Sequence, residues 1–350
     1  MSKARNSLEH AIEFQAAQSS SPLYAHLLEG LLADLLMGGI TAELLEGVSD
    51  QPLHDAIPLR YLATAHRLAL AGNVPELAQW YPSCGGVWHG ENIADVIVAV
   101  ARKYREEFAT GMRRNVQTNE VGRAPVLASS FALIASRHGL PLDLLEIGSS
   151  AGLLSRWDRY YYDTGRSHFG DRTSPLGFGP QWWRDSAPLS FVDLRVARRR
   201  GSDIAPIDAT SPDGRLTMLS FIWPDQLERI DRLRAALDVA QAVPMNIDRA
   251  DAGDWLTLQL VGTPPARTAT VVFHSIVWQY LPKPTRDRVR TALYSAATRA
   301  THDSPLFWLR MEPATAAYAD VRLTTWPGGN EEMLAHVGYH GADIEWLQRD

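Results

Sequence analysis

The sequence predicts an α/β protein, with a helical N-terminal domain over residues 1–140 and an α/β domain over residues 141–350. Two observations lead to this prediction. Before residue 140, apolar side chains recur at helical spacing, as in Leu27, Leu28, Leu31, Leu32, Leu35 and Leu36. From residue 142 onwards, short apolar runs alternate with amphipathic segments, which is typical of a parallel sheet with helices between its strands.

Composition narrows the class of protein. Of the 350 residues, 45% are hydrophobic and 21% are charged, as in ordinary globular proteins. A net charge of −6 argues against nucleic acid as the main partner, because binding to phosphates requires an excess of positive charge. Cys84 is the only cysteine, so neither an intramolecular disulfide nor a multi-cysteine metal site is available.

The N-terminal segment gives no sign of export or membrane insertion. Residues 1–18 are polar and lack a basic stretch followed by an apolar one, so no signal peptide is expected. No run of 18 uninterrupted apolar residues occurs, so no membrane span is expected. We therefore expect a cytoplasmic protein.

In the α/β domain, each element is assigned from its apolar pattern. Expected strands are 142–147, 216–223, 243–247, 269–275 and 305–311. Expected helices are 151–163, 226–240, 252–261 and 284–300. The stretch 164–210 is rich in Gly, Pro, Trp and Arg and is interpreted as an insertion, with 190–196 as a candidate strand. Short β-like runs follow at 321–325, 333–339 and 343–347.

The most informative motif lies where the first expected strand, ending in Glu146-Ile147, runs into the small-residue turn Gly148-Ser-Ser-Ala-Gly152. Glycines in such a turn permit positive φ and a close approach of the backbone to a ligand. Written as E-x-G-x-S-x-G, the motif resembles the cofactor loop of class I S-adenosylmethionine-dependent methyltransferases. Written as G-x-S-x-G, it resembles the nucleophile elbow of α/β-hydrolases, with Ser150 as the nucleophile.

The order of elements favours the methyltransferase interpretation. In a hydrolase the elbow serine follows the fifth of eight strands, whereas the strand before Ser150 is the first one expected here. A triad of Ser150 with an acid and a histidine can still be assembled from the sequence. Such a triad is weak evidence, since the chain contains 11 histidines and 40 acidic residues.

The methyltransferase resemblance implies roles for several residues. Gly148, Ser150 and Gly152 would approach the cofactor through their backbone, and Glu146 would orient the loop or the amino acid end of the cofactor. A carboxylate after the second strand would accept both ribose hydroxyls. Asp225, after the expected strand 216–223, is assigned to this role, and the N-cap of the following helix is the alternative.

Two further positions complete the expected site. Asp251, followed by Ala252, comes after the third expected strand and is assigned to the adenine. His274 lies at the end of the fourth expected strand, near the expected methyl centre, and is a candidate general base. Alternatively, Asp251 lies in a surface turn, and His274 is a structural histidine held by hydrogen bonds.

A second resemblance covers most of the chain. The blocks that carry it are Gln117–Arg123, Leu145–Leu153, Gly201–Asp208 and Trp223–Arg229. They are similar to an uncharacterised bacterial family, domain of unknown function 2332, which implies no established activity. The methyltransferase resemblance is wider and covers about 142–350. It implies a Rossmann-like, methyltransferase-type sheet beside the helical domain.

A further group of polar residues is a candidate for binding the substrate. Asn119, Glu120 and Arg123 form a dense cluster before the first strand, and Tyr160 lies on the expected helix after the glycine turn. A helix cap with a solvated first turn explains the first three equally simply. For Tyr160, packing in the core is the alternative explanation.

The sequence thus predicts S-adenosylmethionine-dependent methyl transfer to a small or medium-sized acceptor. The alternatives are a serine hydrolase that uses Ser150 and a non-catalytic protein that binds a ligand on the same fold. The sequence contains no H-E-x-x-H, C-x-x-C or P-loop motif, so no metal site is expected.

Overall fold

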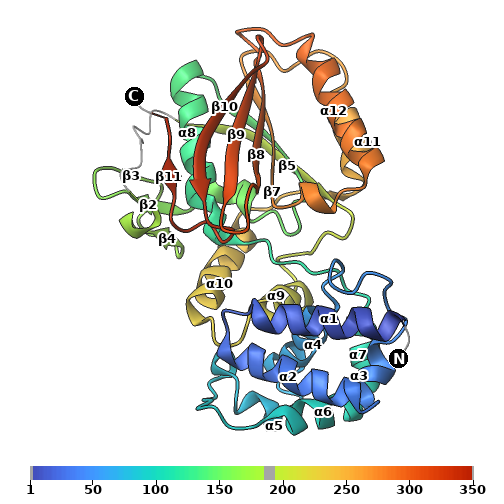
Figure 1. Cartoon of the computed structure of the whole chain (residues 1–350). Helices are drawn as coiled ribbons and strands as arrows, with labels where there is room; N and C mark the ends of the chain where they lie inside the picture. The colour runs from blue at the N-terminus through green and yellow to red at the C-terminus, as the bar shows by residue number, and fades with distance from the viewer. Residues whose placement is uncertain (1–2, 185–193, 349–350) are drawn as a thin grey trace. The chain divides into compact units, whose positions relative to one another are not determined.

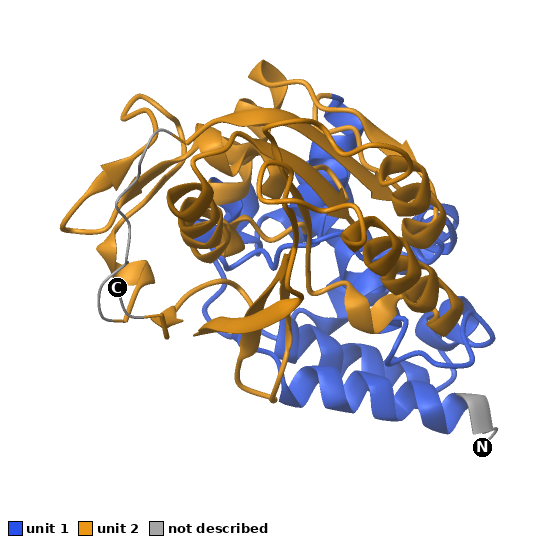
Figure 2. Ribbon diagram, turned by 90° about the horizontal axis from the view of Figure 1, so that it is seen from above, with its two compact units in different colours: residues 1–118, 211–231 blue, residues 119–210, 232–350 orange. Residues whose placement is uncertain are grey.

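The computed structural model describes residues 3–184 and 194–348. The chain divides into two compact units, one formed by Met1–Thr118 with Ser211–Asp231 and the other by Asn119–Thr210 with Arg232–Asp350 (Figure 2). The first unit therefore ends before the expected boundary near 140. It also includes a segment that the sequence placed inside the α/β domain.

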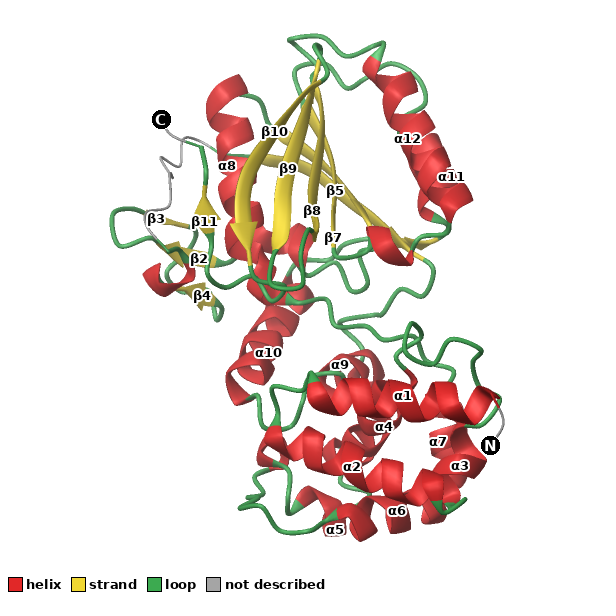
Figure 3. Cartoon of the chain, viewed as in Figure 1, coloured by secondary structure: helices red, strands yellow, loops and turns green. Residues whose placement is uncertain are grey.

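The first unit is helical, as expected for the N-terminal region (Figure 3). Its helices are α1 (Lys3–Ala17), α2 (Pro22–Leu36), α3 (Ile40–Leu45), α4 (Ile57–Leu70), α5 (Pro75–Ala78), α6 (Ala94–Lys103), α7 (Arg105–Gly111) and α9 (Pro212–Ser220). The leucine stripe identified in the sequence lies on α2, where Leu27, Leu28 and Leu31 are fully buried in the core of this unit. Among the described residues, no helix is both long and apolar enough to cross a membrane.

The expected strand 216–223 is wrong, because most of this segment forms helix α9. Ser211 caps the helix through its hydroxyl, which accepts a hydrogen bond from the Gly214 N–H, and Pro212 occupies the first turn. The apolar run that suggested a strand places Met218 and Ile222 in buried positions of the first unit.

In the described part of the second unit, eight strands form one sheet in the order β11-β10-β9-β8-β7-β1-β5-β6 (Figure 1). They are β1 (Leu142–Ile147), β5 (Val196–Asp203), β6 (Ile247–Arg249), β7 (Ala269–Ser275), β8 (Leu306–Pro313), β9 (Ala319–Trp326), β10 (Asn330–Val337) and β11 (Glu345–Trp346). The five strands from β6 to β8 are parallel, and β9, β10 and β11 continue as an antiparallel meander. The sheet is therefore mixed but mostly parallel in its centre.

Helices cover both faces of the parallel strands, as expected for a parallel sheet. On one face α11 (Ala252–Gln259) and α12 (Lys283–Ala297) bury Trp255 and Leu293 against Leu145, Val272 and Trp308 of the sheet. On the other face lies α8 (Ala124–His138), whose Phe131 contacts Phe273 edge to face at 5.2 Å. Helix α10 (Leu227–Ala242) precedes β6 in the chain.

The arginine-rich strand β5 was not expected from the sequence. It carries Arg198, Arg199 and Arg200, each of which forms an ion pair with a carboxylate from a different segment. The partners are Asp143 at 2.7 Å, Asp158 at 2.7 Å and Asp248 at 2.6 Å. These ion pairs neutralise the strand, which lets a charged segment lie directly beside β1.

The other expectations are confirmed to different degrees. Strands 142–147 and 269–275 match β1 and β7, and 305–311 matches β8 closely. Of the three tail runs, 321–325 lies in β9, while 333–339 and 343–347 overlap β10 and β11 in part. The helices expected at 226–240, 252–261 and 284–300 correspond to α10, α11 and α12.

Three segments after the glycine turn and before β7 differ from expectation. The strand expected at 243–247 is found later in the chain, as β6 (Ile247–Arg249). The helix expected at 151–163 is replaced by the short 3₁₀ segment η3 (Leu154–Arg159) and strand β2 (Tyr161–Asp163). Strand β2 pairs with two short strands of the insertion, β3 (His168–Phe169) and β4 (Gly177–Phe178). The candidate strand 190–196 lies largely outside the described residues, and only its last residue, Val196, belongs to β5.

Candidate functional site

The glycine turn after β1 has the backbone that its sequence predicts. Gly148, Ser150 and Gly152 have φ values of +68°, +52° and +67°. Ser150 is the exception to the usual glycine, because residues with a Cβ rarely adopt this left-handed conformation. The turn leads into the 3₁₀ segment η3 and not into the expected long helix, so the N-terminus of an α-helix is not part of this site.

Close packing also explains the two glycines. A Cβ at Gly148 would lie 2.4 Å from Cγ2 of Val277, and a Cβ at Gly152 would lie 2.9 Å from Sδ of Met245. Val277 follows β7, and Met245 precedes β6. The side chain of Val277 therefore already covers Gly148, while the remainder of the turn lies next to the loops after β5 and before β6.

Asp203 is the carboxylate at the carboxyl end of the strand beside β1. Its Oδ2 accepts a hydrogen bond from the Ser150 N–H at 2.9 Å, and its Oδ1 accepts one from the Ala205 N–H at 2.8 Å. The Ile207 N–H in turn donates to the Ser150 carbonyl at 3.1 Å. These bonds attach the loop after β5 to the glycine turn. From the sequence, Asp203 could either hold a loop against the arginines at 198–200 or contribute to a polar site, and it was not assigned to the ribose because β5 was not expected.

Asp225, which was assigned to the ribose, does not lie at the end of a strand. It follows α9 in the first unit, and its Oδ2 accepts a hydrogen bond from the Ser21 hydroxyl at 2.6 Å. Ser21 is also the N-cap of α2, where its hydroxyl accepts from the Tyr24 N–H at 3.0 Å. Asp225 therefore belongs to the structure of the helical unit, and its assignment to the ribose is corrected.

Asp251, which was assigned to the adenine, follows β6, the third parallel strand along the chain, and caps helix α11. Its Oδ1 accepts hydrogen bonds from the N–H groups of Gly253 and Asp254, and Thr285 and Arg288 of α12 donate to the same carboxylate at 2.5 and 2.9 Å. Burial raises the pKa of Asp251, but these hydrogen bonds outweigh burial and leave the pKa lowered. Ala252 is the first residue of the helix and is buried.

A cavity of about 520 Å³ adjoins the glycine turn within the second unit. Its lining combines apolar side chains with carboxylates and an arginine, and includes Ala151, Arg156, Ile207, Asp208, Met245 and Asp248. Arg156 is held in place because it donates to the carbonyls of Ala151, Gly152 and Val243 at 2.8–3.0 Å. The volume falls in the range of sites for small ligands and cofactors.

Two buried polar groups near the turn are unusual: the hydroxyl of Ser150 in the turn and the carboxyl of Glu146 in β1. The Ser150 hydroxyl is buried and has no hydrogen-bond partner among the described residues. Buried polar groups are nearly always paired, so this hydroxyl calls for a water molecule or a ligand. Glu146 accepts a hydrogen bond from the Ser155 hydroxyl at 2.6 Å, and burial raises the pKa of its carboxyl to about 8.

The expected substrate-binding residues mainly hold the backbone of the second unit. The Asn119 amide oxygen accepts from the Leu153 N–H at 3.0 Å, and the Tyr160 hydroxyl donates to the Leu153 carbonyl at 2.6 Å. Glu120 accepts from the Gly122 N–H at 3.1 Å, and Arg123 donates to Ser275 at 3.2 Å. Asn119 and Tyr160 thus fix the end of the glycine turn and act as positioning residues.

His274 has both ring nitrogens engaged. Its Nε2 accepts a hydrogen bond from the Trp308 indole N–H at 3.1 Å, and its Nδ1 lies 2.6 Å from Glu312 Oε1. Because an indole nitrogen only donates, Nε2 carries no proton and Nδ1 donates to Glu312. His274 is also fully buried. This geometry leaves no free nitrogen for a general base, so the candidate role of His274 is corrected.

The serine hydrolase alternative requires a histidine in contact with Ser150. The Ser150 hydroxyl has no hydrogen-bond partner in the part of the chain that the structure describes. His274 is bound to Glu312 and Trp308, and His336 lies 2.9 Å from Asp320. No triad is therefore assembled around Ser150 within the described residues.

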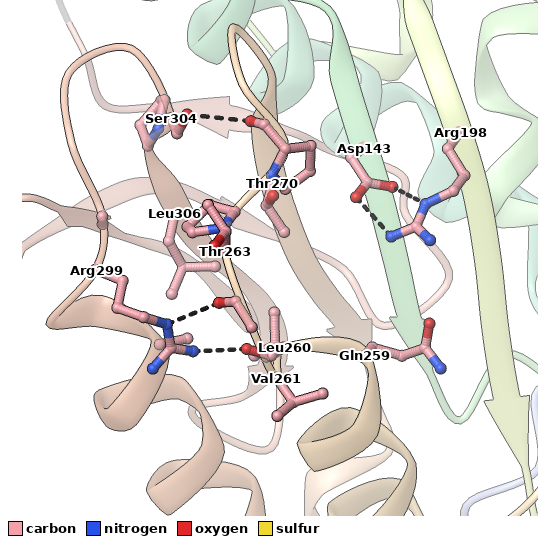
Figure 4. A pocket seen from close by; sticks show the side chains of 16 residues that line it. Asp143, Arg198, Gln259, Leu260, Val261, Thr263, Thr270, Arg299, Ser304 and Leu306 are labelled. Atoms are coloured by element: carbon pink, nitrogen blue, oxygen red, sulfur yellow. Dashed lines mark hydrogen bonds and ion pairs between the residues drawn. The ribbon is translucent and has the colours of Figure 1, made fainter.

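A small pocket of about 50 Å³ lies at the opposite edge of the parallel strands, near the first residues of β1, β7 and β8 (Figure 4). Its arginines have structural roles. Arg299 donates to the carbonyls of Leu260 and Gly262, and Arg198 forms a two-point contact with Asp143. This pocket is too small for a drug-sized ligand, so the carboxyl edge remains the candidate site.

The comparisons with known proteins identify the family of the chain. A model of an uncharacterised protein family conserved in bacteria, DUF2332, matches residues 9–346. The chain belongs to this family. Neither a curated protein nor a solved structure matches the chain. Among the described residues, no group of three or more His, Cys, Asp or Glu side chains is arranged to hold a metal ion.

Proposed function

We propose that this DUF2332 protein binds an S-adenosyl cofactor at the carboxyl edge of its parallel strands and transfers a methyl group to a small molecule. The strand order supports the first part of the proposal. Numbered along the chain, the parallel strands run 3-2-1-4-5, which is the order of Rossmann-like doubly wound sheets. Such sheets bind ligands where the order reverses, outside the carboxyl ends of the strands. Here the order reverses between β1 and β7.

The observation that carries the proposal is the position of Asp203. Its carboxylate ends the strand next to β1, is hydrogen-bonded to the glycine turn, and lies in the segment that leads into the wall of the 520 Å³ cavity. Each oxygen accepts one hydrogen bond from a backbone N–H, and an ionised carboxylate has about four lone-pair sites. Asp203 therefore retains capacity to accept ribose hydroxyls, which is the role first assigned to Asp225.

The rest of the site suits the adenosyl half of the cofactor. The apolar side chains of Ile207 and Met245 offer contact surface for a base, and the buried Ser150 hydroxyl lacks a partner among the described residues. Val277 covers Gly148, so the amino acid end of the cofactor has less room than the adenosyl end. When bound, the cofactor would supply the electrophilic methyl group: its S–CH3 bond would break as the bond to the acceptor atom forms, S-adenosylhomocysteine would leave, and the acceptor would release its proton to solvent. The residues of the chain would contribute binding and orientation of the reactants.

A non-catalytic ligand-binding protein is the second candidate function. Two observations favour it: Val277 occupies the space next to Gly148, and both nitrogens of His274 are engaged. A protein of this class would bind an adenosyl ligand without consuming it. Prolonged incubation with S-adenosylmethionine and candidate acceptors, followed by measurement of S-adenosylhomocysteine, separates the two functions.

The test of the cofactor site is a calorimetric titration with S-adenosylhomocysteine. We expect binding to the wild type, a loss of at least tenfold in affinity for Asp203→Asn, and no change for Asp225→Asn. The second variant is a matched control, because Asp225 bonds Ser21 in the helical unit. Thermal unfolding of each variant separates loss of the site from loss of the fold. Equal affinity in the wild type and Asp203→Asn would refute the proposed site.

A further inference from the structure

A second, larger cavity of about 610 Å³ opens on the face of the sheet that α12 covers. Its walls are aromatic, with Trp278, Trp308, Trp326 and Tyr294 among the lining residues. Trp308 and Trp326 are 6% and 7% exposed, so these indoles are held rigidly by the core, whereas Tyr294 is 58% exposed. Rigid aromatic walls cost little conformational entropy when a ligand binds, and they favour a flat ligand.

The charged groups of this aromatic cavity compensate one another. Arg310 lies 2.6 Å from Glu331, and Arg322 lies 3.1 Å from Glu331 and 2.8 Å from Asp320. Together with Arg290 and Glu312, the lining carries three arginines and three acidic residues. A strongly anionic or cationic ligand would have to break these pairs, so the cavity favours a ligand with little net charge.

Guanidinium groups already lie over the indoles inside the cavity. The guanidinium carbon of Arg310 lies 4.1 Å from the ring centroid of Trp308, and that of Arg290 lies 5.1 Å from the centroid of Trp278. The rings of Trp278 and Trp308 are 5.6 Å apart. A guanidinium stacked on an indole presents its second face to a further flat ring. The wall is therefore suited to an aromatic ligand with polar substituents.

One loop connects this cavity to the glycine turn. Val277 covers Gly148, while the next residue, Trp278, lines the aromatic cavity. Glu312 holds the loop by accepting the N–H groups of both residues at 3.1 and 3.2 Å. Ile276 before them has a φ of +53°, which is a strained value for a β-branched residue. The two sites are thus neighbours that share the loop after β7.

We propose that the aromatic cavity is the acceptor site and that the acceptor is a planar aromatic molecule of one or two rings with little net charge. This inference rests on the proposed methyl transfer, because only that function requires an acceptor beside the cofactor. The role of the loop follows from its position: it separates the two ligands, and movement of Val277 would bring the acceptor and the adenosyl cofactor into contact.

The test uses two probes of similar size, 2-naphthol and decahydro-2-naphthol, of which only the first is planar. Binding of each probe is measured by ligand-observed NMR titration. We expect 2-naphthol to bind at least tenfold more tightly than its saturated analogue. Trp278→Leu and Tyr294→Ser should each weaken 2-naphthol binding at least fivefold. Tyr280→Ser is the matched control, because Tyr280 is equally exposed, at 57%, and does not line the cavity.

Titration of the same samples with S-adenosylhomocysteine separates the two proposals. If S-adenosylhomocysteine binds while 2-naphthol does not, the acceptor class is refuted and the cofactor proposal stands. Equal binding of the two probes, or an equal effect of all three variants, also refutes the acceptor class. If 2-naphthol binds as expected but S-adenosylhomocysteine does not, the proposed function fails and the acceptor assignment fails with it.

Discussion

The buried carboxyl of Glu146 leads to a prediction about stability and pH. Its side chain is 3% exposed, and burial raises its pKa from 4.5 to about 8, against the hydrogen bond from Ser155 and the charge of Arg156. Between pH 4.5 and 8 the folded chain therefore keeps a proton that the unfolded chain releases. This contribution to stability is complete below pH 4.5 and is lost progressively as the pH rises to and through 8.

The magnitude follows from the two pKa values. A tenfold change in proton affinity corresponds to about 1.4 kcal/mol, so this carboxyl removes about 4 kcal/mol of folding free energy between pH 5 and 9. The amide introduced by Glu146→Gln keeps the shape of a protonated carboxyl and has no proton to lose. The stability of the variant relative to the wild type should therefore increase by about 4 kcal/mol over the same range.

The assay is urea denaturation followed by tryptophan fluorescence at pH 5, 7 and 9, with wild type and variant side by side. Other titrating groups are common to both proteins and cancel in the difference. Glu106→Gln, on the exposed face of α7, is the matched control and should give the same difference at all three pH values. A constant difference for Glu146→Gln as well would show that the carboxyl is ionised in the folded protein, and would refute the reasoning.

Three further variants test the packing around the turn and the sheet. Gly148→Ala should lower the free energy of unfolding by about 2 kcal/mol, because the new Cβ would clash with Val277. In a double-mutant cycle, adding Val277→Ala should restore part of the lost stability. Ser150→Gly should raise stability by up to about 1 kcal/mol by relieving a left-handed serine, as measured by urea denaturation. Arg199→Met should lower stability by about 3 kcal/mol, because Asp158 loses its buried partner and keeps only the exposed Arg159, whereas adding Asp158→Asn should recover most of the loss.

Much of the sheet could be predicted from local sequence. Strands β1 and β7 are mainly apolar, and the burial of every residue of β1 explains why the pattern is clear. The glycine turn was also predictable, since a Gly-rich segment directly after a buried strand favours positive φ.

Strand β5 could not be predicted in this way. Its three consecutive arginines lie in a strand only because Asp143, Asp158 and Asp248 approach from elsewhere in the chain, and their positions are information that no local window contains. Because this strand was not expected, Asp203 was not assigned to the ribose. Once β5 is known to end at Asp203, the acid beside the glycine turn follows directly.

The helix that replaces the expected strand 216–223 could have been predicted from the residues just before it. The segment Ser211-Pro-Asp213 carries a capping hydroxyl, a proline for the first turn and an acidic residue near the positive end of the helix dipole. Together they predict a helix start, against the apolar run that suggested a strand. No local signal shows that both ring nitrogens of His274 are hydrogen-bonded, because its partners Glu312 and Trp308 lie 38 and 34 residues away in the sequence.

Hydrogen–deuterium exchange with and without S-adenosylhomocysteine tests the central claim most directly, because it locates the ligand along the chain. We expect added protection in two segments, 148–153 after β1 and 203–210 after β5. We expect no added protection at 223–226, around Asp225. Protection at 223–226, or no change anywhere at a saturating concentration of the ligand, would contradict the assignment of the carboxyl edge as an adenosyl-binding site.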